Sequence, residues 1–178
     1  RTFKEAFQKC IRSMEIQRAG YGLDRNDRWM DAAHKRYAGG EADAYRLLDK
    51  RQEDDAVMFG SRQGEAPPDL DESTATHWPI DPIALRQKLK TPCQGRPYYI
   101  RYAFKMGWTV DQVHELTKID PWFLDQMAQL VEFESELLSH GPQVKAAMEH
   151  GGVGLGADLL KKCRMLGYSG PQLSNALK

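Results

Sequence analysis

Residues 103–116 read AFKMGWTVDQVHEL, and residues 163–177 read CRMLGYSGPQLSNAL. The two stretches share a glycine, an aromatic residue, a hydroxyl residue and a glutamine at the same spacing: Gly107, Trp108, Thr109 and Gln112 in the first, Gly167, Tyr168, Ser169 and Gln172 in the second. Glycine readily adopts the left-handed conformation that ends a helix, and a hydroxyl residue followed three positions later by glutamine is a capping box that begins one. Each stretch therefore predicts two helices joined by a tight structural turn.

Helical patterns also cover most of the remaining chain. Thr2 followed by Glu5 is a further capping box ahead of an apolar stripe, and the pairs Asp81-Pro82 and Asp120-Pro121 each provide an N-cap followed by proline. Weaker helical patterns occur at 28–37 and 42–59. We therefore expect an all-α fold: an irregular helical domain of short helix pairs, with a long mobile loop.

The expected loop covers residues 60–79, which are rich in glycine, serine, proline and acidic residues. Pro67-Pro68 lies inside this segment, and such composition is typical of exposed loops. A chain of 178 residues can bury one good core or two small ones, and its length alone favours one domain. We expect a single helical domain over 1–178 that contains the loop, and the start at Arg1 rather than Met suggests a piece of a longer chain.

The composition argues against several classes of protein. Lys plus Arg equals Asp plus Glu at 25 each, so no overall field attracts nucleic acid or anionic lipid. No apolar run approaches the roughly 20 residues of a membrane span, so we expect no membrane association. Three widely spaced cysteines, Cys10, Cys93 and Cys163, form no paired motif. This pattern favours a reducing cytoplasm.

Nucleic-acid binding is the alternative that the repeated unit itself suggests, because its spacing resembles DNA-reading helix-turn-helix motifs. The second helix of the first unit would carry Asp111 and Glu115 against the single basic residue Lys118. Acidic residues on a recognition helix repel a polyanion. We therefore expect no nucleic-acid partner. A free-standing helix-turn-helix binder and a general helical interaction module remain the alternatives.

The sequence nominates no catalytic, cofactor-binding or metal-binding residue. Gly152, Gly154 and Ala157 fit a nucleotide-binding glycine pattern, but a helical stretch precedes them where a strand is needed. The five histidines have no ligand-like spacing, and no serine, cysteine or lysine lies in a nucleophile motif. We expect a chain without catalysis of its own.

Three stretches of the sequence together resemble one known family. They are RTFKE running into RSME at 1–15, the segment YIRYAF through ELTKIDPWFL at 99–124, and residues 160–173 around LGYS. In this order they resemble the large subunit of carbamoyl-phosphate synthetase, in the helical domain that joins its two ATP-using halves. The resemblance covers roughly half of the chain and lapses between residues 25 and 91, where this chain is longer.

The resemblance implies an all-α oligomerisation and spacer domain with no substrate or ATP residue of its own. It implies flanking ATP-grasp halves that use ATP with magnesium or manganese, and a glutamine amidotransferase small subunit that supplies ammonia. The whole enzyme would make carbamoyl phosphate from bicarbonate for arginine and pyrimidine biosynthesis in the cytoplasm. For self-association we select Ile11 and Met14 on the first helix. The alternative is that both residues belong to the core.

Overall fold

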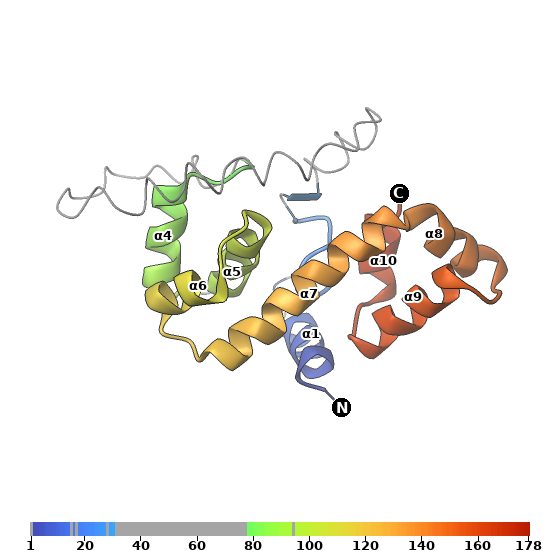
Figure 1. Cartoon of the computed structure of the whole chain (residues 1–178), viewed down its shortest axis with the longest axis horizontal. Coiled ribbons are helices and arrows are strands. Elements are labelled where there is room, and N and C mark those ends of the chain that lie inside the picture. Colours follow the sequence, from blue (N-terminus) through green and yellow to red (C-terminus); the bar gives the residue numbers. More distant parts are fainter. Residues whose placement is uncertain (1, 15, 17, 28, 31–77, 94) are drawn as a thin grey trace. The chain divides into compact units, whose positions relative to one another are not determined.

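The computed structural model describes residues 2–14, 16, 18–27, 29–30, 78–93 and 95–178. The regular elements of these described residues are helices, which confirms the all-α prediction (Figure 1). The helical segments predicted at 28–37 and 42–59 lie almost entirely outside the described residues, and so does most of the loop predicted at 60–79.

The chain divides into two compact units. One contains residues 1–27 and 119–178, and the other contains residues 28–118. Each repeated turn belongs to a different unit, the first to residues 28–118 and the second to the unit that contains the C-terminus. The expectation of a single domain over 1–178 stays a prediction.

The unit of residues 28–118 packs three helices against one another: α4 (Pro82–Lys90), α5 (Arg96–Lys105) and α6 (Val110–Thr117). Asp81 caps α4 by accepting a hydrogen bond from the Ala84 amide at 2.9 Å, and Pro82 fills the first turn as predicted. The apolar faces meet in a core whose fully buried members are Ile80, Ala84, Leu85, Leu89, Ile100, Ala103 and Val113. Burial of these side chains holds the three short helices together.

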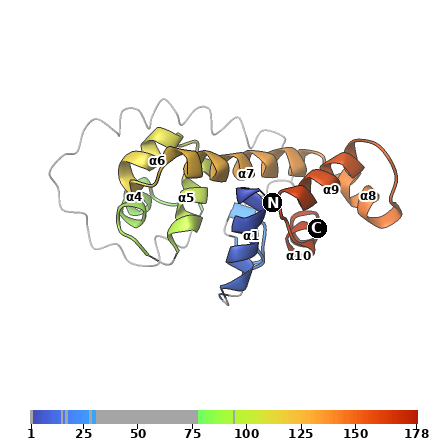
Figure 2. The same cartoon turned by 90° about the horizontal axis from the view of Figure 1, so that it is seen from below.

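The unit with the C-terminus contains α1 (Phe3–Ser13), α7 (Pro121–Ser139), α8 (Gly141–His150), α9 (Leu155–Met165) and α10 (Gly170–Ala176). The 19-residue α7 is its longest helix, and α1 and α8 both pack against it. Helices α8 and α9 lie side by side in both views (Figure 1 and Figure 2). Gly156 permits this close approach, because a Cβ added there would lie 2.2 Å from the Gln143 carbonyl oxygen.

The C-terminal ends of α1 and α7 are set in different ways. Helix α1 ends at Ser13, although the nearest glycines after it are Gly20 and Gly22, and residues 18–27 follow as an irregular segment. Thr2 caps α1 by accepting from the Glu5 amide at 3.3 Å. At the other boundary, Pro142 lies in the first turn of α8 as well as following α7. Proline is compatible with a helix start, so one signal serves both helices.

The two repeated turns have nearly the same backbone geometry. Gly107 and Gly167 adopt φ of 84° and 87°. In the first turn the Trp108 amide donates to the Ala103 carbonyl, and in the second the Tyr168 amide donates to the Cys163 carbonyl, each at 3.0 Å. These bonds, with those from the glycine amides, form a Schellman motif that satisfies the last carbonyls of α5 and α9. Complete capping boxes then begin α6 and α10.

Gly107→Val should destabilise the chain, because a β-branched residue is strained at a φ of 84°. We expect a loss of unfolding free energy of about 1 kcal/mol or more, measured by urea denaturation. Gly170→Ala is the control, because Gly170 lies in the first turn of α10 and an added Cβ there meets nothing within 4 Å. Equal midpoints for Gly107→Val and the unaltered chain would contradict the assigned turn.

Candidate functional site

The second turn is the point at which helix α1 is fastened to the C-terminal helices. A Cβ added at Gly167 would lie 2.9 Å from the Glu5 Cα, so the α1 backbone passes directly against this glycine. The Arg12 guanidinium donates to the Gly167 carbonyl at 2.7 Å. Gly167 therefore serves two purposes: it permits the left-handed turn, and it leaves room for α1.

Gln172 extends the capping box of this turn into a buried polar network. Its Oε1 accepts from the Ser169 amide at 2.9 Å, while its Nε2 donates to the Gly22 carbonyl at 2.8 Å and lies 3.4 Å from Oε1 of Gln8. Oε1 of Gln8 also accepts from the Tyr21 amide at 2.8 Å. Both glutamines are fully buried, so these bonds satisfy polar groups that water does not reach.

Further hydrogen bonds hold the irregular segment 18–27 against the same turn. The Ser169 hydroxyl donates to the Ala19 carbonyl at 3.0 Å, and Asn175 of α10 donates to the Leu23 carbonyl at 3.2 Å. Side chains of the second repeat therefore replace the regular backbone partners that this segment lacks.

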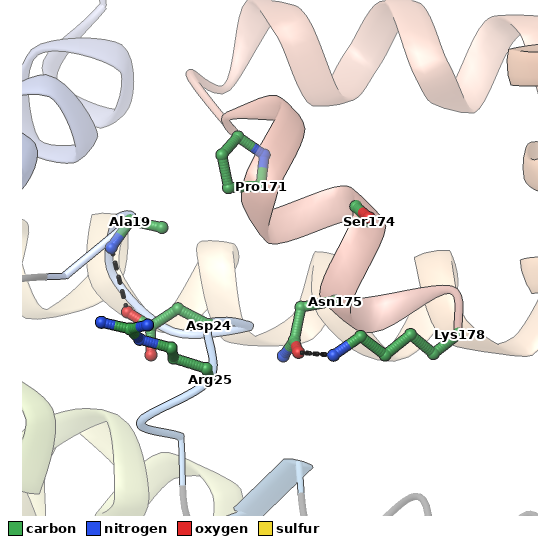
Figure 3. Close-up of a pocket in the computed structure, with 7 residues that line it drawn as sticks. All are labelled: Ala19, Asp24, Arg25, Pro171, Ser174, Asn175 and Lys178. Carbon is green, nitrogen blue, oxygen red and sulfur yellow. Dashed lines mark hydrogen bonds between the residues drawn. The ribbon is translucent and has the colours of Figure 1, made fainter.

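A pocket of about 430 Å³ lies between this segment and α10 (Figure 3). Its lining residues are Ala19, Asp24, Arg25, Pro171, Ser174, Asn175 and Lys178. On the α10 side the Lys178 ammonium donates to Oδ1 of Asn175 at 2.9 Å. Arg25, Ser174 and Lys178 are all exposed, so the cations at the rim are solvated and exert only a weak field.

Asp24 is the acid of this pocket, and its carboxylate serves the local fold. It accepts from the amides of Ala19 at 3.2 Å and Asn26 at 3.1 Å, and it pairs with the Arg18 guanidinium at 2.9 Å. Burial raises the pKa of Asp24, although Arg18 and the two amides oppose the increase. Because its oxygens are engaged in this way, the group is a structural anchor of the segment.

Aromatic side chains gather where the first turn of α7 meets α1. The Phe3 ring centroid lies 5.5 Å from that of Trp122 and 5.3 Å from that of Phe123. Trp122 is 54% exposed and Phe123 is 44% exposed, whereas the next residue, Leu124, is fully buried. Sequence reasoning missed this cluster. The available signal was three consecutive apolar residues at a helix start, because successive helix positions cannot all face one core.

The residues selected from the sequence fall in two different settings. The eight turn residues occupy the two Schellman turns and their capping boxes described above. Ile11 is only 3% exposed and belongs to the core, whereas Met14 is 45% exposed. For Ile11 the structure thus favours the core alternative, and self-association through this helix stays a prediction.

The described residues also bear on two other kinds of site. No group of three or more His, Cys, Asp or Glu side chains among them is arranged to hold a metal ion. Among the same residues, no helix is both long enough and apolar enough to cross a membrane. The described residues do form a hydrogen-bonded network at the second turn and an exposed aromatic cluster.

Comparison with known proteins decides the family. A family described as "Carbamoyl-phosphate synthetase large chain, oligomerisation domain" matches residues 55–178. The chain belongs to this family. This stretch includes α4 to α10 and both repeated turns. Two of the three stretches on which the resemblance was based therefore lie within the matched region, and the stretch at 1–15 lies outside it.

Individual relatives of this oligomerisation domain carry the same name. The chain is 33% identical over 174 residues to the carbamoyl phosphate synthase large chain of Archaeoglobus fulgidus, covering 98% of this chain and 11% of that protein. It is 36% identical over 141 residues to the large chain of Rhodopirellula baltica, covering 79% and 9%. It is 39% identical over 108 residues to that of Vibrio cholerae, covering 61% and 9%. The chain thus spans about a tenth of these relatives.

The three cysteines should differ sharply in reactivity. Cys163 is fully buried, and burial raises the pKa of its thiol to about 12, whereas Cys10 and Cys93 are exposed. At pH 8 the reactive thiolate of Cys163 is then only about one part in 10⁴. Iodoacetamide followed by mass spectrometry should modify two cysteines in the native chain and three in denaturant. Modification of all three at similar rates in the native chain would contradict the burial of Cys163.

The two capping-box glutamines should respond differently to the same substitution. Gln172→Glu places a buried carboxylate oxygen against the Gly22 carbonyl and Gln8, so we expect a loss of about 1–3 kcal/mol of unfolding free energy. Gln112→Glu is the matched control, because its capping bond to the Thr109 amide is exposed and glutamate serves equally well there. Urea denaturation measures both variants. Equal losses would contradict the special role of Gln172.

Proposed function

We propose that this chain acts as a self-associating helical spacer within a carbamoyl-phosphate synthetase large chain and performs no catalysis itself. The observation that carries the proposal is the match of α4 to α10 to a domain described as an oligomerisation domain. The chemistry of the described residues supports it, because buried polar side chains among them, such as Gln172 and Asp24, form hydrogen bonds that hold the fold together.

The rest of the proposal concerns the longer protein. We infer that the large chain contains two ATP-grasp halves flanking this domain and uses ATP with magnesium or manganese there, while this chain binds no cofactor. A glutamine amidotransferase small subunit would supply ammonia from glutamine. The whole enzyme would make carbamoyl phosphate from bicarbonate for arginine and pyrimidine biosynthesis in the cytoplasm. These inferences rest on the family and on relatives about ten times longer than the matched region.

Nucleic-acid binding is not proposed. Helix α6, which would read a groove if the first repeat were a DNA-binding unit, carries exposed Asp111 and Glu115. Helix packing is sufficient to explain its capping box and the Schellman turn that precedes it. The family assignment gives this alternative no support either.

Sedimentation velocity on the 178-residue chain tests self-association. We expect the sedimentation coefficient to rise between micromolar and millimolar concentration, because an oligomerisation domain presents a surface that a second copy covers. Of the two residues predicted on α1 for self-association, Ile11 and Met14, Met14 is the exposed one and is accessible to a second copy. A gel-shift titration in low salt runs in parallel. A monomer at every concentration would overturn self-association, and tight, salt-sensitive duplex binding would overturn the proposed role.

A further inference from the structure

We draw no further inference here: the strongest candidate, the partly exposed aromatic cluster of Phe3, Trp122 and Phe123 where the first turn of α7 meets α1, carries nothing because no feature of the described residues shows what covers it.

Discussion

The left-handed turn at Gly167 is the constraint on which the unit containing the C-terminus depends. Because this residue has no side chain, α9 can end there and the α1 backbone can pass within van der Waals reach of the same point. Arg12 of α1 donates a hydrogen bond to the Gly167 carbonyl, and Gln172 of α10 donates one to the Gly22 carbonyl. Two ends of the sequence thereby meet through one glycine and two hydrogen-bonding side chains.

The same turn chemistry produces different results in its two copies. At Gly107 the Schellman motif and the capping box of Thr109 and Gln112 join two helices of a three-helix core, and Gln112 is partly exposed. At Gly167 the equivalent glutamine, Gln172, is fully buried and reaches the Gly22 carbonyl. How much a repeated turn motif contributes to stability thus depends on the residues that pack against it. This is why a capping box alone does not identify a function.

Local features of this fold follow from short-range physics and could be predicted from the sequence. Glycine stops, hydroxyl caps and Asp-Pro starts act over a few residues, so Asp81, Thr109 and Gly167 were assigned their roles correctly. Long-range relations could not be predicted. Nothing near Gln172 in the sequence indicates that it binds Gly22, and the stripe containing Ile11 and Met14 does not reveal which member is buried. The resemblance supplied the family, which local physics could not.

Native-state amide hydrogen exchange tests the central claim most directly, because it measures whether α1, residues 18–27 and α10 open as one unit. The Tyr21 amide, which donates to Gln8, should exchange with the same opening free energy as the α10 amides, since one network holds both. Equal denaturant dependence of the two sets of amides is the predicted result. Rapid exchange at Tyr21 while the α10 amides stay protected would show that the second turn does not fasten the N-terminal segment, and would contradict the account.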